Sequence, residues 1–80
     1  MTEAQLLLVT ASECHLCAHA REVLKSLRLE VREVDVAGAE AQQLAARGIP
    51  LAFLPVLWDG ERVLGYGRLS ARALRRKLAA

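Results

Sequence analysis

The sequence lacks any unbroken run of about 18 apolar residues, the length that a membrane-spanning helix needs. It also lacks a basic stretch followed by a long apolar one near its N-terminus, where Thr2, Glu3 and Gln5 precede only a short apolar run from Leu6 to Val9. This pattern argues against a secretory leader. We therefore expect a cytoplasmic protein with no membrane partner.

Aromatic residues are scarce, with only Phe53, Trp58 and Tyr66 in the chain. The sequence is nevertheless 54% hydrophobic, which is too apolar for a disordered segment. A chain of 80 residues has room for one core, so we expect residues 1–80 to form a single domain. The net charge of +2 gives no reason to expect a nucleic-acid partner.

Cysteine is equally scarce: the chain holds Cys14 and Cys17 and no others. A disulfide between residues three apart closes a tiny loop and restrains the unfolded chain little. The cytosol moreover keeps thiols reduced. A structural disulfide is therefore an unsatisfactory explanation for this pair, and a chemical role is the better one.

Hydrophobic patterning predicts four strands and three helices in the order β-α-β-α-β-β-α. The strands are expected at residues 5–10, 31–36, 54–58 and 62–66, and the helices at residues 14–28, 40–47 and 71–78. Two βα units joined by right-handed crossovers give parallel strands, and a closing hairpin adds antiparallel ones. We therefore predict an α/β fold with a mixed four-stranded sheet and helices on both faces.

Local signals refine this outline. Ser12 and Ser70 are the expected N-caps of the first and last helices. Asp59-Gly60 predicts a two-residue type I′ hairpin, in which both residues have positive φ. Leu74 and Leu78 are expected to face inward from the last helix.

The end of the chain is rich in basic residues, namely Arg68, Arg72, Arg75, Arg76 and Lys77. One interpretation is a solvated helix face near a helix C-terminus, where cations suit the helix dipole. The other is a docking patch for an acidic partner. The sequence leaves both open.

The motif Cys14-His15-Leu16-Cys17 falls where the first strand ends and the first helix begins. The open N–H groups and the dipole at a helix N-terminus stabilise an anion, so a thiolate at Cys14 would gain from both. Cys17 lies one turn further along, where it can attack a mixed disulfide held on Cys14. Because the thiolate is the nucleophile, we predict a depressed pKa at Cys14 but not at Cys17.

Two histidines accompany the cysteines. A protonated His15 would favour the adjacent thiolate, but an exposed residue of the first turn with little effect is an equal alternative. His19 is expected to be a solvated helix residue rather than a ligand.

Pro55 opens the predicted strand Leu54-Pro55-Val56-Leu57. Proline is tolerated as the first residue of a strand, and the residues alone favour a trans peptide bond. A cis bond would instead turn the N–H and C=O of Leu54 toward the cysteines and offer a partner peptide a strand-like pairing site.

From Leu6 to Leu78 the arrangement resembles the glutaredoxin-like branch of the thioredoxin superfamily: a strand, CxxC, a βα unit, an apolar-Pro-Val-Leu strand, a DG hairpin and a glycine-containing turn into a last helix. The resemblance is strongest to a small bacterial glutaredoxin-like family with Cys-His-Leu-Cys and Leu-Pro-Val-Leu. It implies a thioredoxin-like fold and thiol–disulfide exchange, with Cys14 as nucleophile, Cys17 as resolving thiol and Pro55 as a cis-proline facing them. Pro50, in Arg47-Gly48-Ile49-Pro50, is the weaker candidate for the cis-proline.

The same resemblance implies that Leu54, Pro55, His15, Gly65 and Tyr66 contact the substrate, a protein or small-molecule disulfide. Gly65 to Ser70 lacks the acidic pair with which glutaredoxins hold glutathione, and is closer to redoxins that are recharged by thioredoxin reductase. Either glutathione or thioredoxin reductase is expected to supply the electrons. We expect a monomer that binds no cofactor and no metal.

Two other functions remain open. One is a metal or iron–sulfur carrier that uses the CxxC motif, although Cys14, His15, Cys17 and His19 cannot all point at one ion from adjacent positions of a helix. The other is a non-catalytic binding module that has kept the fold.

Overall fold

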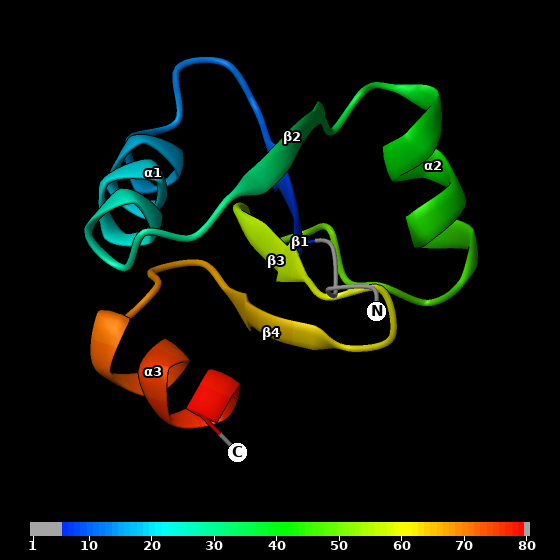
Figure 1. Cartoon of the computed structure of the whole chain (residues 1–80). Coiled ribbons are helices and arrows are strands. Elements are labelled where there is room, and N and C mark those ends of the chain that lie inside the picture. The colour runs from blue at the N-terminus through cyan, green and yellow to red at the C-terminus, as the bar shows by residue number, and fades with distance from the viewer. Residues whose placement is uncertain (1–5, 80) are drawn as a thin grey trace.

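A computed structural model describes residues 6–79, and Figure 1 shows how their elements are arranged. The observed order matches the predicted one: β1 (Leu6–Thr10), α1 (His15–Ser26), β2 (Val31–Asp35), α2 (Ala39–Ala46), β3 (Val56–Trp58), β4 (Val63–Tyr66) and α3 (Ala71–Ala79). The predicted first strand began at Gln5, which lies outside the described residues.

The four strands form one mixed sheet in the order β2-β1-β3-β4. β1 pairs with β2 in parallel, whereas the β1–β3 and β3–β4 pairs are antiparallel. Helices α1 and α3 cover one face of the sheet and α2 covers the other (Figure 1). The predicted mixed sheet with helices on both faces is therefore confirmed.

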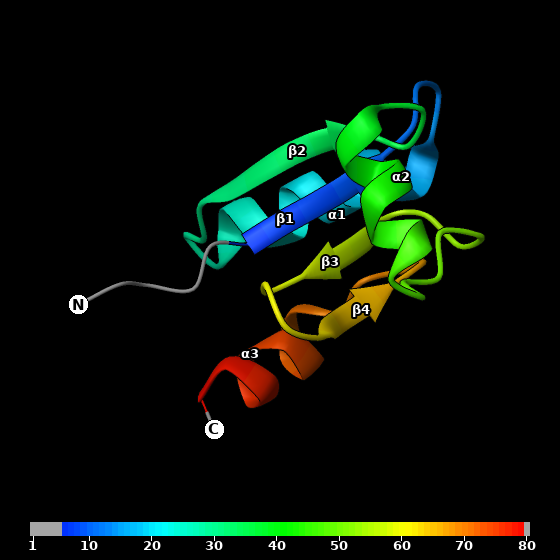
Figure 2. The same ribbon diagram turned by 90° about the vertical axis from the view of Figure 1, so that its right-hand side faces the viewer.

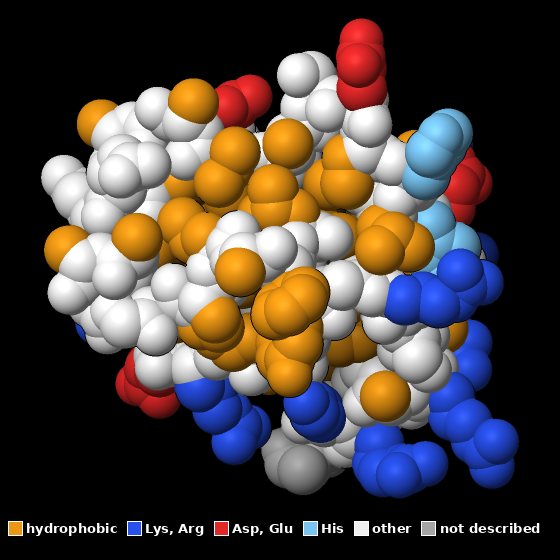
Figure 3. Space-filling model, turned by 180° about the vertical axis from the view of Figure 1, so that it is seen from behind, with side chains coloured by type: hydrophobic (Ala, Val, Ile, Leu, Met, Phe, Trp, Pro, Cys, Tyr) orange, Lys and Arg blue, Asp and Glu red, His pale blue; other side chains and the backbone are white. Residues whose placement is uncertain are grey.

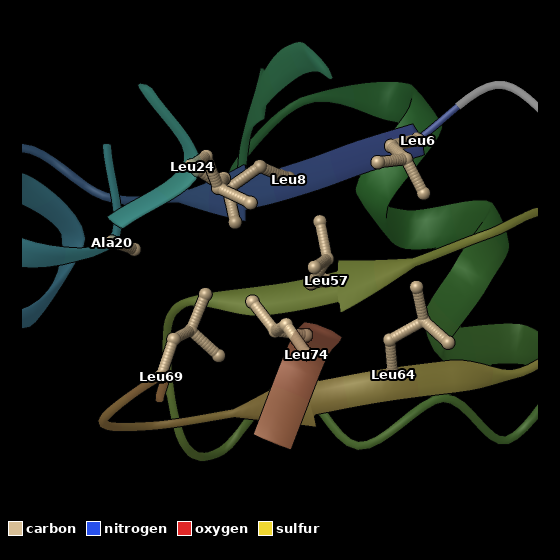
Figure 4. Close-up of a cluster of buried hydrophobic side chains, with 8 residues drawn as sticks. All are labelled: Leu6, Leu8, Ala20, Leu24, Leu57, Leu64, Leu69 and Leu74. Atoms are coloured by element: carbon tan, nitrogen blue, oxygen red, sulfur yellow. The ribbon is translucent and has the colours of Figure 1, made fainter. Parts of the chain in front are cut away.

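The position of β1 explains its continuous apolar sequence. Successive side chains of a strand point to opposite faces, and both faces of this central strand are covered by helices. Leu6 and Leu8 pack against α1 and α3, in the cluster drawn in Figure 4. Leu7 and Val9 pack on the opposite side, against α2. Two small cores thus hold β1 from both faces.

Both α1 and α2 end in a Schellman motif, in which a residue with positive φ follows the helix and the last carbonyls are capped by backbone N–H groups. At α2 this residue is Gly48, which has no β-carbon and has φ of 92°. At α1 it is Arg28, with φ of 58°. A β-carbon makes this conformation costly, so the end of α1 is less favourable than that of α2.

The hairpin between β3 and β4 differs from the prediction. Gly60 has positive φ but Asp59 does not, and the strands are joined by the four residues 59–62. The Asp59 carboxylate accepts hydrogen bonds from the N–H groups of Glu61 and Arg62, both at 2.8 Å. This local side-chain cap replaces the type I′ geometry, because aspartate readily bonds the backbone two residues on.

Predictions for the last helix are partly right. Ser70 is its N-cap, since its hydroxyl accepts a hydrogen bond from the N–H of Ala73 at 3.2 Å. Leu74 is buried, as expected. Leu78 is 41% exposed, so its predicted inward position is wrong. Leu78 instead lines an open hollow between the last turns of α1 and α3, together with Leu27, Leu29 and Arg75.

Candidate active site

Cys14 caps the N-terminus of α1. Its backbone is extended, and its Sγ accepts a hydrogen bond from the N–H of Cys17 at 3.2 Å. The predicted cap, Ser12, is two residues too early, so that prediction is wrong. Cys14 itself occupies the position in which an acceptor side chain satisfies the open amides of the first turn.

The two thiols differ in exposure and in acidity. Cys14 is partly exposed, whereas Cys17 is fully buried. A hydrogen bond from the Cys17 thiol, helped by the N–H groups of Cys17 and Leu16, lowers the pKa of Cys14. Burial, with the nearby Cys14 sulfur, raises the pKa of Cys17. Both directions agree with the sequence prediction. The pair thus combines one accessible thiol of lowered pKa with one buried thiol of raised pKa beside it.

The loop between β1 and α1 bends sharply just before Cys14. Glu13 has φ of 55°, a conformation unusual for a residue with a β-carbon. Glu13, Cys14, His15 and Ala18 line a shallow hollow on the surface. His15, the first residue of α1, is exposed at the rim of this hollow. His19 is half-buried rather than solvated as predicted, and its Nδ1 has no hydrogen-bond partner among residues 6–79.

Strand register brings Pro55 to the same edge of the sheet as Cys14. Val9, next to the end of β1, pairs with Val56, the first residue of β3. Cys14 follows the end of β1 and Pro55 precedes β3, so both lie at one end of the sheet. That end is at the right in Figure 2.

The Leu54–Pro55 peptide bond is cis and that of Pro50 is not, which answers the question the sequence left open. Pro55 is buried, and its carbonyl accepts a hydrogen bond from the N–H of Gly67 at 2.9 Å. The N–H and C=O of Leu54 make no hydrogen bond within residues 6–79.

Gly65 and Tyr66 belong to β4 and lie beside Pro55, since Tyr66 pairs with Val56. A β-carbon on Gly65 would come within 3.0 Å of a methyl group of Leu69, so this position favours glycine. The Tyr66 ring is 56% exposed and lies 6.1 Å, centroid to centroid, from the ring of Phe53, which is 63% exposed. Phe53 was not among the predicted site residues. Its position two residues before Pro55 was the signal for it.

A charged network on the α1 side of the sheet was also missed. Arg21, one turn beyond Cys17, donates two hydrogen bonds to the Glu33 carboxylate, at 2.8 and 2.9 Å. Glu33 also accepts a hydrogen bond from the hydroxyl of Thr10, the last residue of β1. The positive charge of Arg21 contributes to the lowered pKa of Cys14. The spacing of four residues between Cys17 and Arg21 was the available signal.

Residues 6–79 lack the features of two other classes of site. No helix in this range is long and apolar enough to cross a membrane. Over the same residues, no three histidine, cysteine, aspartate or glutamate side chains gather as a metal site would require. Neither His15 nor His19 joins Cys14 and Cys17 in such a group.

The element order and the strand order β2-β1-β3-β4 define a thioredoxin-type fold of the glutaredoxin kind. The solution structure of a glutaredoxin from Brucella melitensis is similar, with a TM-score of 0.61 over 99% of this chain and 83% of that one. The two chains share 22% sequence identity, so the likeness concerns the fold. No family model matches the chain, and no curated protein matches it.

Proposed function

We propose that this protein is a glutaredoxin-like thiol–disulfide oxidoreductase that works by dithiol exchange through Cys14 and Cys17. One observation carries the proposal. Cys14 is a partly exposed N-cap that accepts a hydrogen bond from an amide of α1, and a buried second thiol lies one turn behind it. Because thiolates are the attacking species, this asymmetry suits a nucleophile and a resolving thiol.

The exchange proceeds in two steps. The Cys14 thiolate attacks one sulfur of a substrate disulfide, forming a mixed disulfide and releasing the other substrate sulfur as a thiolate that takes up a proton. Cys17 then loses its proton and attacks the Cys14 sulfur, which closes the Cys14–Cys17 disulfide and releases the second substrate thiol. The substrate gains two electrons and the protein loses them.

The raised pKa of Cys17 suits the order of these steps. A buried thiol that stays protonated does not compete for the substrate, and it becomes a nucleophile only when Cys14 is already bonded. Leu54 supports the proposal further, because its N–H and C=O have no hydrogen-bond partner within residues 6–79 and lie next to cis-Pro55 at the same end of the sheet. An extended substrate could add to the chain there as a short strand.

The substrates proposed are protein or small-molecule disulfides, and the setting proposed is a monomer in the cytoplasm. Electrons would return to the oxidised pair from glutathione or from thioredoxin reductase. NADPH consumption with each donor system, in the presence of this protein and hydroxyethyl disulfide, distinguishes the two.

Two cysteine variants test the mechanism. Pre-reduced wild-type protein should reduce hydroxyethyl disulfide or insulin, and Cys14→Ser should abolish the reaction. Cys17→Ser should retain the first step and accumulate a mixed disulfide on Cys14, visible by mass spectrometry. Equal rates for wild type and Cys14→Ser would reject the proposal.

A further inference from the structure

Charge is distributed very unevenly along this chain. Glu61 is the last acidic residue, and six basic residues follow it without a single acid. Residues 1–61, in contrast, carry nine acidic and five basic residues. The small net charge of +2 thus conceals a basic end joined to an acidic remainder.

Four exposed arginines in and just before α3 form what we call the basic ridge: Arg68, Arg72, Arg75 and Arg76. Within residues 6–79 the ion pairs involve Arg21, Arg32 and Arg62, and none involves the ridge. Seen from behind (Figure 3), Lys and Arg side chains gather along the lower edge of the molecule, below a central group of hydrophobic side chains. The ridge therefore carries positive charge that the described part of the fold does not neutralise.

Helix stability does not account for the ridge. Cations are favourable in the last turn of a helix, which covers Arg76 and Lys77. Arg72, however, is in the first turn, which contains no acid, and Arg68 precedes the Ser70 cap. Cations are unfavourable at this end of the dipole, and Arg72 and Arg76 repel each other at a spacing of four residues. The arrangement is better explained by an anionic partner.

The ridge begins at the candidate active site. The N–H of Gly67 binds the carbonyl of Pro55, and Arg68 is the next residue. The exposed ring pair of Phe53 and Tyr66 adjoins both, since Tyr66 pairs with Val56 directly after Pro55 and precedes Arg68 by two residues. A chain bound at Leu54 could thus pass the two rings and continue along α3.

We infer that the disulfide which Cys14 attacks belongs to an acidic polypeptide segment. An apolar side chain of that segment would pack on the Phe53–Tyr66 ring pair and its carboxylates would lie along the basic ridge. This inference rests on the proposed function and specifies its substrate. The ridge extends from Arg68 to Arg76 and adjoins both the exposed rings and the Leu54 peptide group, and this run of different contacts suits an extended polypeptide. Complementary charge would chiefly raise the rate of association and the selectivity.

Two synthetic peptides provide the test. Each contains two cysteines joined in one disulfide beside a leucine, and they differ only in flanking residues, which are aspartate and glutamate in one and lysine in the other. Pre-reduced protein is mixed with excess peptide, quenched by alkylation and analysed by mass spectrometry, so that no external reductant is needed. At low salt the acidic peptide should react about tenfold faster, and this preference should fall to about twofold in 0.5 M salt because exposed charges are screened.

A matched pair of double variants locates the effect. Arg72→Gln/Arg76→Gln should lower the preference for the acidic peptide several-fold while the slower reaction of the lysine peptide is retained. Lys25→Gln/Arg47→Gln removes the same net charge from other elements and should leave the preference unchanged. Circular dichroism and thermal melting confirm that both variants are folded.

The outcomes separate the two levels of the proposal. If wild-type protein reduces neither peptide, the exchange itself is rejected, and the inference falls with it. If it reduces both at equal rates at low salt, or if the ridge variant keeps the preference, the exchange stands and the inference is overturned. A labelled DNA duplex that binds with a salt dependence lost in the ridge variant, while the peptides show no preference, would assign the ridge to nucleic acid instead.

Discussion

The two Schellman motifs allow a reciprocal test of how backbone conformation contributes to stability. Arg28 and Gly48 occupy the same position after α1 and α2, with φ of 58° and 92°. Their N–H groups bind carbonyls three residues back, at 3.0 Å in both cases, so the hydrogen bonding is matched. The main difference between the positions is the β-carbon of Arg28.

The expected magnitude follows from two opposing terms. Replacing Arg28 with glycine relieves a left-handed conformation that costs a residue with a β-carbon about 1–2 kcal/mol. The greater freedom of glycine in the unfolded chain takes back about 0.4–1 kcal/mol. Arg28→Gly should therefore stabilise the protein by about 1 kcal/mol, which for a domain of this size raises the melting temperature by about 4–8 °C.

Gly48→Ala is the converse change. A β-carbon at Gly48 would meet no atom within 4 Å, so no clash contributes to the result. The loss should again be about 1 kcal/mol, and it should come from backbone conformation alone. Arg28→Ala, which removes the side chain but keeps the β-carbon, is the control and should change stability by less than about 0.5 kcal/mol.

Thermal and urea unfolding of the reduced proteins measure all three variants. The reasoning would be refuted if Arg28→Ala stabilised the protein as much as Arg28→Gly, since the arginine side chain rather than its β-carbon would then be responsible. A stabilising Gly48→Ala would refute it as well.

Three further predictions concern the site and its support. Arg21→Gln should slow alkylation of Cys14 near neutral pH by about two- to threefold, because a nearby cation is lost, whereas Arg32→Gln, which breaks the other two-bond ion pair, should leave the rate unchanged. Leu24→Ala should cost about 3 kcal/mol in urea unfolding, since this side chain is 2% exposed in the core of Figure 4. The hydrogen bonds and charge of Arg21 lower the pKa of Glu33 in the folded protein. The stability that this ion pair contributes is therefore present above the pKa of Glu33 in the unfolded chain and is lost as the pH falls through its lower pKa in the folded protein. Because the pair is exposed, Glu33→Gln should lower the free energy of unfolding by less than about 1 kcal/mol at pH 7 and by little at pH 2.

Much of the fold could be predicted because local patterns and tertiary packing agree. The continuous apolar run of β1 indicated a strand buried on both faces, and Leu6 to Val9 do point alternately into the two cores. Ser70 begins α3 through its hydroxyl, and Gly48 follows α2 in the left-handed conformation that glycine adopts readily. In these segments one physical preference dominates.

The errors at the N-terminus of α1 and at the hairpin arose where the sequence allowed two local solutions. Ser12 and Cys14 can both cap a helix, and the bend at Glu13 decides in favour of the cysteine. Asp59 can adopt positive φ or bond its own backbone, and it takes the second option. Each choice depends on the path of the chain through space rather than on residue type.

The candidate site shows the same division. Cys14 and Cys17 were evident from their spacing and from their place after the first strand. For Phe53 and Arg21 the sequence held only a weak signal, their spacing from Pro55 and from Cys17. The structure identifies them by the ring contact with Tyr66 and by the hydrogen bonds to Glu33 on another element. Contacts between distant parts of the chain leave no periodic trace in the sequence.

The rate of alkylation of each cysteine as a function of pH, followed by mass spectrometry on the reduced protein, addresses the site most directly. Cys14 should react with a midpoint clearly below the ordinary cysteine value of about 8.5, and Cys17 should react later, with a higher midpoint. A Cys14 midpoint at or above that ordinary value would mean that the amides of α1 do not stabilise its thiolate.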